Sequence, residues 1–328
     1  MDLSIIIVNY RGWKHLKKCL DSIAAFKLRI LHTEVIIVDN DSDDGKLEEF
    51  KSSYPHFTFI NNKVNGGFSN GCNLGSESAK GDYLLFLNPD TVSSESVVEK
   101  LFERAKNNPQ NFISSCRQVN ENGRESKAYG IFPDYGTLTG FERAIYRLVN
   151  KEKIREKMQT GDNVIHPDWV SGSVMMIQTE IFKIIGGFDE DYWMYYEDTD
   201  ICRRARNKGG NIAYYTDITI QHNHGGSSRI NLETTSLTKT EVYISNHLYI
   251  SKHKSGIDRI LIQSYLIILN LLGGLFSAIL GSFLFAIPKL HIKAIIYFRL
   301  VGYYFGVLKH RSWISPRSVN FKNDCHLN

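Results

Sequence analysis

Short apolar segments alternate with segments of helical periodicity along the first part of the chain. Residues 3–8 (LSIIIV) and 34–38 (EVIIV) are rich in β-branched side chains and end in polar turns, and residues 57–61 and 83–87 (YLLFL) follow the same pattern. Between the first two, residues 13–26 carry apolar side chains at helical spacing. Strands that alternate with helices at this spacing predict an α/β fold with a doubly wound, mostly parallel sheet.

The pattern is less regular beyond residue 90. Residues 94–106 predict an exposed helix, and residues 117–158 are polar and loop-rich, with a charged helix over 141–157. For 117–158 we favour an insertion over a flexible loop on the acceptor side. Three more elements follow: a strand over 169–177 with small residues at its centre, a helix over 199–207 and a strand over 218–221.

The C-terminal part is apolar and basic. Residues 260–288 contain no charged residue and are long enough, as a helix, to cross a hydrocarbon core of roughly 30 Å. A second apolar run, 294–308, is rich in tyrosine and interrupted by Arg299, which is typical of an interfacial helix. A buried helical hairpin is the alternative. The predicted domains are therefore residues 1–250, a catalytic or binding domain, and residues 251–328, a helical membrane-associating extension.

Composition and charge narrow the possibilities. The chain has 328 residues, of which 42% are hydrophobic, so it can form a substantial core. From Ser251 onward 10 Lys or Arg stand against two Asp or Glu, so a net charge of +4 for the whole chain leaves about −4 on residues 1–250. The five scattered cysteines predict neither a disulfide framework nor a zinc site and suggest a reducing compartment. The segment MDLSIIIVNY has an acid where a secretory leader needs positive charge.

Polar residues stand at the ends of the predicted strands. Asn9, Asp39 and Asp90 each follow an apolar run, and the carboxyl ends of parallel strands meet at the edge where such sheets bind ligands. Asp90, helped by Asn88, could hold a divalent cation against a diphosphate, although a solvated aspartate at a strand end would look the same. Gly67 lies in a glycine-rich turn before a helix, which permits close approach of a ligand to free backbone amides.

A second acidic cluster comes later in the chain. Glu197, Asp198 and Asp200 lie within four positions. Acids at a helix N-terminus are stabilised by the helix dipole, which would explain one or two of them. The helix dipole does not explain the aromatic residues that flank the acids. Aromatic neighbours would raise the pKa of a carboxylate towards that of a general base. The flanking aromatic residues are Tyr192, Trp193, Tyr195 and Tyr196.

Two further features are open to more than one interpretation. Gly172 lies within a predicted strand, where glycine marks either close approach by a ligand or a bulge. His222 and His224 stand two apart after the last strand and are either metal ligands or surface residues. A nicotinamide-binding oxidoreductase is disfavoured, because the residues after the first strand, NYRGWKH, lack the GxGxxG fingerprint.

Taken together, the motifs over residues 1–230 resemble family 2 glycosyltransferases of the GT-A fold, most closely the rhamnosyltransferase-like branch. SIIIVNY resembles the first nucleotide-binding strand of the family and VIIVDNDSDDG the second, KVNGGFSNGCN has the spacing of the glycine-rich turn, LLFLNPD stands at the DxD metal motif, and YYEDTD stands at the ED motif. The first Asp of DxD is Asn88 here, as in that branch.

The resemblance implies a role for individual residues. Asp198 would be the general base, and Asp90 would bind a divalent metal, Mg²⁺ or Mn²⁺, with His222 as a further ligand. The implied donor-binding residues are Asn9, Asp39, Gly67, Asn73, Asn88 and Asp90. The implied acceptor-side residues are Trp169, Gly172, Glu197 and Asp200, of which Glu197 and Asp200 would orient the site or support it structurally.

The implied function is inverting sugar transfer at the cytoplasmic face of the plasma membrane, peripheral or with one C-terminal membrane segment. The donor would be dTDP-L-rhamnose or a UDP-hexose, and the acceptor a hydroxyl of a lipid-linked glycan in O-antigen, capsule or cell-wall polysaccharide synthesis. Nucleic acid is not an expected partner. The alternative is a non-catalytic, membrane-attached protein of the same fold that binds a nucleotide-sugar or a glycan.

Overall fold

A computed structural model describes residues 1–26, 31–161, 163–223 and 231–324. The chain forms two compact units. The first comprises Met1–Asp189 and Glu197–Ser227, and the second comprises Glu190–Tyr196 and Ser228–Asn328. The boundary predicted at residue 250 falls inside helix α9 (Leu232–His253), so the structural division precedes it. The two units are described separately below.

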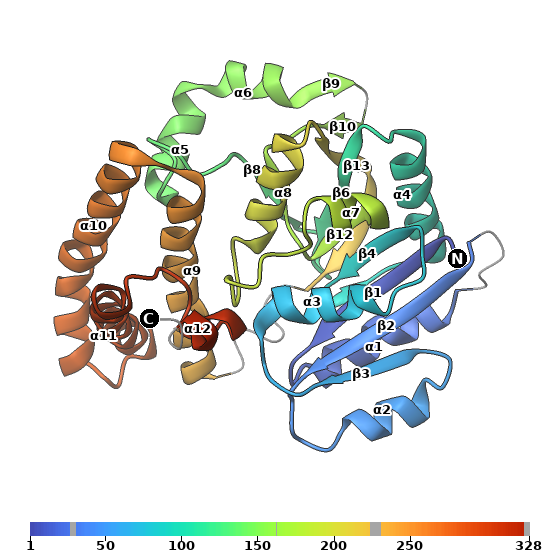
Figure 1. The fold of residues 1–328 in the computed structure, drawn as a ribbon, viewed down its shortest axis with the longest axis horizontal. Helices are drawn as coiled ribbons and strands as arrows, with labels where there is room; N and C mark the ends of the chain where they lie inside the picture. The colour runs from blue at the N-terminus through green and yellow to red at the C-terminus, as the bar shows by residue number, and fades with distance from the viewer. Residues whose placement is uncertain (27–30, 162, 224–230, 325–328) are drawn as a thin grey trace. The chain divides into compact units, whose positions relative to one another are not determined.

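The first unit is built on a mixed, mostly parallel sheet (Figure 1). Strand β1 pairs in parallel with β2 and β4, β2 with β3, and β6 with β13, whereas β12 runs antiparallel between β4 and β6. The predicted α/β class is confirmed. The strands of this sheet, in spatial order, are β3 (Thr58–Asn62), β2 (Thr33–Asn40), β1 (Leu3–Asn9), β4 (Tyr83–Leu87), β12 (Val174–Gln178), β6 (Asn111–Val119), β13 (Asn211–His222), β10 (Val164–Ile165) and β9 (Gln159–Gly161).

Short strands and helices complete the first unit. Strand β5 (Thr91–Val92) pairs with β13 and β7 (Glu125–Ser126) with β6, while β8 (Tyr129–Gly130) and β11 (Trp169–Val170) form a separate pair. The helices are α1 (Trp13–Ala24), α2 (Leu47–Ser53), α3 (Gly67–Glu77), α4 (Glu95–Asn107), α5 (Gly140–Val149), α6 (Lys151–Met158), α7 (Thr179–Ile184) and α8 (Glu197–Asn207).

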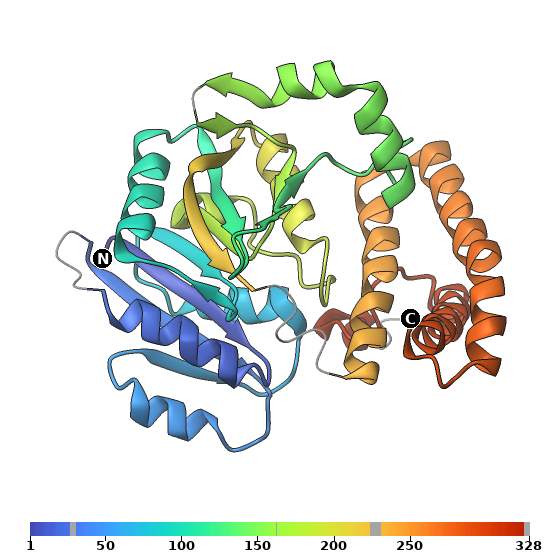
Figure 2. The same ribbon diagram turned by 180° about the vertical axis from the view of Figure 1, so that it is seen from behind.

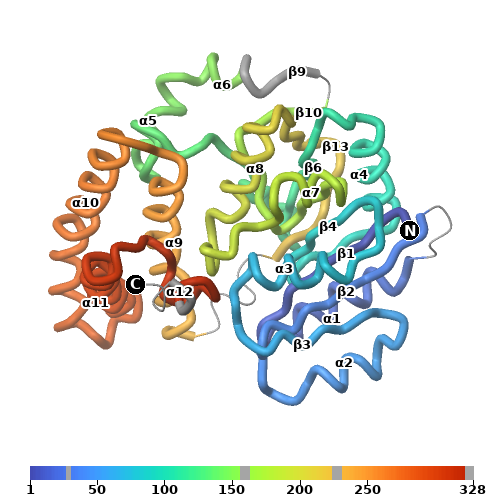
Figure 3. Tube along the Cα trace, in the orientation of Figure 1, coloured from blue at the N-terminus to red at the C-terminus, as the bar shows by residue number. Residues whose placement is uncertain are grey.

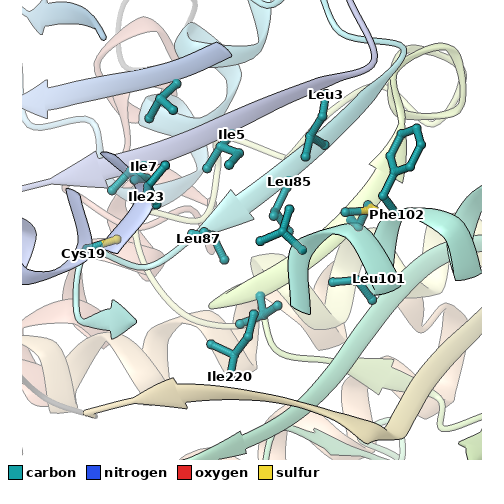
Figure 4. Packing of buried hydrophobic residues seen from close by; sticks show 14 of the residues in the cluster. Leu3, Ile5, Ile7, Cys19, Ile23, Leu85, Leu87, Leu101, Phe102 and Ile220 are labelled. Atoms are coloured by element: carbon teal, nitrogen blue, oxygen red, sulfur yellow. The ribbon is translucent and has the colours of Figure 1, made fainter. Parts of the chain in front are cut away.

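Alternation along β1 gives the sheet two apolar faces. Leu3, Ile5 and Ile7 pack in one cluster with side chains of α1 and α4, which Figure 4 shows from close by. Ile6 and Val8 belong to the opposite cluster, which includes side chains of α3, α7 and α8. Figure 2 shows α1 and α4 on the near side of the sheet. Because helices cover both faces, the central strands β1 and β4 are apolar at most positions.

Several predicted elements differ from the observed ones. The strand predicted over 169–177 is interrupted at residues 171–173, and the helix predicted over 141–157 is two helices, α5 and α6. Strand β6 was not predicted, and β13 is much longer than the predicted 218–221. In β6, polar residues occupy buried positions and obscure the apolar pattern. In β13, the apolar run over 212–215 is separated from 218–221 by the polar residues Thr216 and Asp217, which are not buried.

The second unit is helical and can be followed as a tube in Figure 3. It consists of α9, α10 (Gly256–Phe283), α11 (Pro288–His310) and α12 (Val319–Asp324). Helix α11 packs against both α9 and α10 around a small core that includes Ile244, Leu300 and Tyr303. Of the helices in the described ranges, α10 alone is long and apolar enough to cross a membrane, by length and composition. Most of its apolar stretch is exposed.

Candidate active site

The carboxyl ends of β1 and β2 form one side of the site. Asn9 and Asp39 are register partners, and Asn9 Nδ2 donates to Asp39 Oδ1 at 3.3 Å. Asp39 also accepts from the Ser42 hydroxyl at 2.5 Å and from the Ser42 amide at 3.2 Å. Burial raises the pKa of Asp39, while these hydrogen bonds oppose the shift. The carboxylate therefore fixes the turn after β2 as well as facing the edge of the sheet.

The glycine-rich turn lies beside this edge. Gly67 begins α3 with a φ of +84°, a left-handed conformation that favours glycine, and its carbonyl accepts from Asn40 Nδ2 at 2.9 Å. Asn73, farther along α3, donates to the Phe188 carbonyl at 2.8 Å and accepts from the Phe188 amide at 2.9 Å. The donor-binding role of Asn73 stays a prediction, and its observed contacts tie α3 to the segment before α8.

The end of β4 brings a carboxylate, an imidazole and two amides together. Asp90 Oδ1 lies 3.0 Å from His222 Nε2 at the end of β13, and both side chains are buried. Asn88 Nδ2 is 3.5 Å from the same imidazole nitrogen. On the other side of the ring, His222 Nδ1 lies 2.7 Å from Gln118 Oε1 at the end of β6. Three strands thus converge on one imidazole.

The contact with Gln118 orients the ring of His222. Gln118 Oε1 also accepts from the Ser173 hydroxyl at 2.9 Å, and an amide oxygen can only accept, so in its hydrogen bond with Gln118 the Nδ1 of His222 is the donor. His222 Nε2 faces the Asp90 carboxylate in one of two states: it donates a hydrogen bond to Asp90, or it presents its lone pair to a cation that both atoms share.

The residues present fit a divalent cation in the second of these states. A carboxylate oxygen and an imidazole nitrogen suit Mn²⁺, and a hydrogen bond from the distal imidazole nitrogen, here to Gln118, is the usual support for a ligating histidine. Within the described ranges, no group of three or more His, Cys, Asp or Glu side chains gathers around one point. A bound metal would therefore take its other ligands from amides, substrate phosphates or water.

The N-terminus of α8 carries the second carboxylate. Asp198 Oδ1 accepts from the Thr199 amide at 2.6 Å and from the Thr199 hydroxyl at 3.2 Å, and Oδ2 accepts from the Gly172 amide at 3.3 Å. Burial raises the pKa of Asp198, and these donors hold it below the value that burial alone would give. Part of the surface of Asp198 remains exposed.

Glu197 lies next to Asp198 in sequence but has a different environment. It is buried, and its Oε2 has no hydrogen-bond partner among the residues that the structure describes. Burial, followed by the neighbouring charges of Asp198 and Asp200, raises its pKa well above the ordinary value for glutamate. Burial also raises the pKa of Asp198, but more hydrogen-bond donors oppose the shift there.

The segment 171–173 joins the two carboxylate sites. The Gly172 amide holds Asp198, while the Ser173 carbonyl accepts from the Asn88 amide at 3.0 Å and the Ser173 hydroxyl reaches Gln118. A Cβ added at Gly172 would lie 3.1 Å from the Phe68 ring and 3.6 Å from Asp198 Cβ. Gly172 therefore marks a close approach, but the neighbours observed there are protein atoms.

Two predicted acceptor-side residues make structural contacts. The indole of Trp169 donates to the Ile131 carbonyl at 2.9 Å and lies against Gly130, and Asp200 is fully buried and accepts from Arg204 Nε at 2.7 Å. Their roles towards an acceptor stay predictions.

The aromatic residues before α8 make their described contacts within the second unit. There, Arg317 lies over Trp193 and Tyr196 packs on Tyr249. Burial is the largest cause of the raised pKa of Asp198, and a contribution of the aromatic residues to it stays a prediction.

Gln118 is the site residue that the sequence analysis missed. Its position near the end of a strand of small and polar residues gave no apolar pattern by which to place it. The only available signal was a polar residue near the end of a segment that alternates with helices. His224, the other histidine of the predicted pair, lies outside the described residues.

Comparison with known proteins identifies the family. The family model described as "Glycosyl transferase family 2" matches residues 4–170, half of the chain, and a model described as "N-terminal domain of galactosyltransferase" matches residues 164–224. The chain belongs to glycosyltransferase family 2. All of the site residues described above lie within these two matches.

Curated relatives place this glycosyltransferase near rhamnosyltransferases. It is 30% identical to a low-salt glycan biosynthesis hexosyltransferase of Haloferax volcanii, covering 68% of this chain and 67% of that one. It is 28% identical to the rhamnosyltransferase WbbL of Escherichia coli K12 (64% and 79% covered) and 22% identical to an N-acetylglucosaminyl-diphospho-decaprenol L-rhamnosyltransferase of Mycobacterium tuberculosis (69% and 77%). The rhamnosyltransferase-like branch is confirmed.

Solved structures confirm the GT-A fold of this glycosyltransferase. The mannosyltransferase PcManGT of Pyrobaculum calidifontis, in complex with GDP-Man and Mn²⁺, matches with a TM-score of 0.54 at 13% identity, covering 90% of this chain and 73% of that one. GalNAc-T7 with UDP, GalNAc and Mn²⁺ matches with a TM-score of 0.55 at 17% identity. This match covers 77% of this chain and 50% of the GalNAc-T7 chain.

Proposed function

We propose that this glycosyltransferase transfers a sugar with inversion, using Asp198 as the general base. The observation that carries the proposal is the joining of Asp198 to the Asp90–His222 pair through the single segment 171–173. One carboxylate is thereby available to an acceptor hydroxyl while another faces the site of a leaving diphosphate. A direct displacement needs only one carboxylate at the sugar, so the buried Glu197 is not required as a second nucleophile.

The proposed step is a single displacement at the anomeric carbon. The acceptor hydroxyl gives its proton to Asp198 Oδ2 or Oδ1 as its oxygen forms the new glycosidic bond, and the bond from the anomeric carbon to the diphosphate oxygen breaks. The raised pKa of Asp198 makes it a stronger base than an ordinary aspartate, and the Thr199 and Gly172 donors keep it ionised before the reaction. They also orient the carboxylate.

The negative charge that develops on the departing diphosphate would be stabilised at the other end of the site. Asp90 and His222 would hold a divalent metal, which when bound would neutralise the developing charge on the diphosphate oxygens. Backbone amides at the N-terminus of α3 would offer further donors to phosphate oxygens. The hydrogen bond between His222 Nδ1 and Gln118 orients the ring so that Nε2 lies beside Asp90.

The donor that we propose is dTDP-L-rhamnose, with Asn9, Asp39 and Asn88 among its contacts. Support comes from two relatives that are named as rhamnosyltransferases. Because another relative is named as a hexosyltransferase, a UDP-hexose is the competing donor. The proposed acceptor is a hydroxyl of a lipid-linked glycan, since the name of the mycobacterial relative specifies a diphospho-decaprenol-linked sugar.

Exposed apolar residues support a location at the cytoplasmic face of the membrane. On α10, Leu272, Phe276 and Phe283 are each more than two-thirds exposed. On α5, in the first unit, Phe141 and Leu148 are about as exposed and lie on one helical face. Basic residues accompany α5, and the charges of Arg147 and Arg143 add to burial in lowering the pKa of Lys127 to about 8. Apolar side chains beside positive charge fit an anionic bilayer surface.

Replacing Asp198 by Asn tests the catalytic proposal. The variant should lose about 100-fold or more in kcat, because a positioned general base contributes roughly that much, while the dissociation constant for dTDP stays the same. Turnover is measured with dTDP-L-rhamnose and a panel of UDP-hexoses, and binding by isothermal titration. Asp217→Asn, which removes a carboxylate from an exposed ion pair with Arg104, is the matched control. Unchanged turnover in Asp198→Asn would refute the assignment of the base.

Replacing Asp90 by Ala tests the metal proposal. Wild-type protein should bind dTDP more tightly with Mn²⁺ than after chelation, and Asp90→Ala should lose most of that difference, because one of the two protein ligands is gone. Affinity in the absence of metal should change little. An equal effect of Mn²⁺ on both proteins would show that the metal is held elsewhere.

A further inference from the structure

The second unit contains a cavity of about 440 Å³, the size of a small-molecule site. Residues of α9, α11 and the segment after α11 line it. Apolar side chains such as Leu237, Ile244 and Val307 form one part of the wall, and Glu241, Arg299 and Arg317 form another. The cavity is therefore amphiphilic, with charge concentrated in one region.

The charges in this cavity are not balanced. Glu241 is buried and accepts from the Ser315 hydroxyl at 2.9 Å, while Arg317 Nε lies 3.7 Å from Glu241 Oε1, too far for a hydrogen bond. Arg299 Nη1 is buried and has no hydrogen-bond partner within the part of the chain that the structure describes. Two guanidinium groups thus face one carboxylate, and a buried donor lacks an acceptor. Guanidinium groups match the geometry of phosphate oxygens.

Two glycines of α11 leave the cavity open. A Cβ added at Gly302 or Gly306, one turn apart, would meet no atom within 4 Å. On the same helix, Phe298 and Phe305 flank Gly302 at helical spacing and are 61% and 68% exposed. The cavity thus adjoins exposed apolar side chains. These would contact a ligand that has an apolar chain, but they would not contribute to the binding of a small, fully hydrated anion.

We propose that this cavity binds the phosphate group of an amphiphile, with the phosphate oxygens on Arg299 and Arg317 and the apolar chain along α11. Two sources share this chemistry, a phospholipid headgroup and a prenyl diphosphate carrier. The inference is independent of the proposed transfer reaction, because it concerns only residues of the second unit.

Titration of the whole chain with farnesyl diphosphate tests one source. Saturating dTDP and Mn²⁺ are present, so that binding to the donor site does not contribute. Arg299→Gln should weaken binding about 10-fold or more, because a charged hydrogen bond is lost. Lys293→Gln, which removes one exposed positive charge from the same helix, should stay within about twofold. Asp198→Asn should bind like wild type, so failure of the catalytic proposal is separable from failure of this one.

A cavity-filling variant provides the second test. Gly306→Leu places a side chain in open space and replaces glycine with a better helix former, so its Tm should be maintained or raised. Its binding of farnesyl diphosphate should nevertheless be lost. Binding by inorganic pyrophosphate as tight as that of farnesyl diphosphate would overturn the apolar part of the proposal.

Vesicles of phosphatidylcholine with and without phosphatidylglycerol test the other source. If Arg299→Gln and Gly306→Leu weaken binding to phosphatidylglycerol vesicles but Lys293→Gln does not, the ligand is a phospholipid headgroup. If the same variants affect only farnesyl diphosphate, the ligand is a prenyl diphosphate. If neither probe distinguishes the cavity variants from Lys293→Gln, the proposal is wrong.

The pH dependence gives an independent readout. Burial raises the pKa of Glu241 to about 7. The hydrogen bond from Ser315 and the charges of Arg317 and Arg299 oppose this rise. Tyr303 also faces Glu241. Lowering the pH from about 8 to about 6 protonates Glu241 and removes a negative charge beside the guanidinium groups, so binding should strengthen. Glu241→Gln should remove this part of the pH dependence, and an unchanged profile would contradict the assignment.

Discussion

Adjacent carboxylates at the start of α8 show how hydrogen-bond donors oppose the effect of burial. Glu197 and Asp198 share one helical turn, and burial raises the pKa of both. The Asp198 carboxylate accepts hydrogen bonds from Gly172 and Thr199, whereas Oε2 of Glu197 has no partner among the described residues. These donors favour the charged form of Asp198 and so oppose the rise in its pKa. The two residue types alone do not reveal which of the acids is the base.

Thr199→Val should therefore shift the pH profile of the enzyme. Valine keeps the backbone amide bond to Asp198 Oδ1 but removes the hydroxyl donor at 3.2 Å, so the ionised form loses stabilisation and the pKa of Asp198 rises further. Because the general base must be ionised, kcat/KM falls at acidic pH, and this acidic limb should move to higher pH by about half a unit to one unit. The profile of kcat/KM against pH provides the measurement.

Thr199→Ser is the control for that experiment, because it retains the hydroxyl and loses only a buried methyl group. It should give the wild-type pH profile even if its Tm falls. A shift of the same size in both variants would mean that packing at Thr199, and not its hydroxyl, controls the base.

At the scale of single elements, the break between β11 and β12 positions the site. A continuous strand was predicted over 169–177, but residues 171–173 leave the sheet, and their amides, carbonyls and hydroxyls contact Asp198, Asn88 and Gln118. Small residues are needed there because Phe68 lies against Gly172. The glycine signal in the sequence was therefore correct about a close approach, although sequence alone could not identify the neighbour.

Gly172→Ala should impair catalysis by displacing the Asp198 carboxylate and not by changing its charge. Its Cβ would lie 3.1 Å from the Phe68 ring and 3.6 Å from Asp198 Cβ, so the ring or the segment must shift. A misplaced catalytic group costs about 100-fold in rate, so we expect a loss of kcat of up to that size. Steady-state kinetics, with Tm measured in parallel, provide the check.

Phe68→Leu should partly restore activity in the Gly172→Ala background, because the smaller side chain relieves the contact. A double-mutant cycle in which the two changes are additive would show that the contact does not transmit the defect.

How far the sequence predicts these elements depends on their apolar pattern. The ends of β1, β2 and β4 were predicted because fully buried strands give uninterrupted apolar runs, and so the edge carrying Asn9, Asp39 and Asp90 followed. Strand β6 was missed because the buried polar residues Ser114, Ser115 and Gln118 interrupt its apolar pattern. Ser115 and Gln118 make hydrogen bonds there, to Val174 and Ser173. The link from Gln118 to His222 spans distant segments, which local patterns do not encode.

At the scale of the whole molecule, charge and exposed apolar surface are distributed over both units. Residues from Ser251 onward carry a large positive excess, and residues 1–250 are acidic on balance, yet basic side chains are concentrated around α5 in the first unit. A sequence average over 1–250 conceals that local concentration. The capping box of Thr139 and Glu142 fixes the start of α5, while Phe141, Ile145, Leu148 and Val149 remain exposed. Residues 117–158, for which an insertion was favoured, thus contain an amphipathic helix.

Removing the apolar face of α5 should weaken membrane binding even with the C-terminal helices intact. Burying one large apolar side chain contributes about 1.5–3 kcal/mol, so Phe141→Ser combined with Leu148→Ser should lower affinity for phosphatidylglycerol-containing vesicles at least about 10-fold, as measured by co-sedimentation. Ile184→Ser, at another exposed apolar position in the first unit, on α7, is the control and should bind like wild type. Equal binding by all three proteins would mean that the first unit does not contact the bilayer through α5. In that case the exposed apolar face of α10 would account for membrane attachment, and the basic residues around α5 would need another anionic partner.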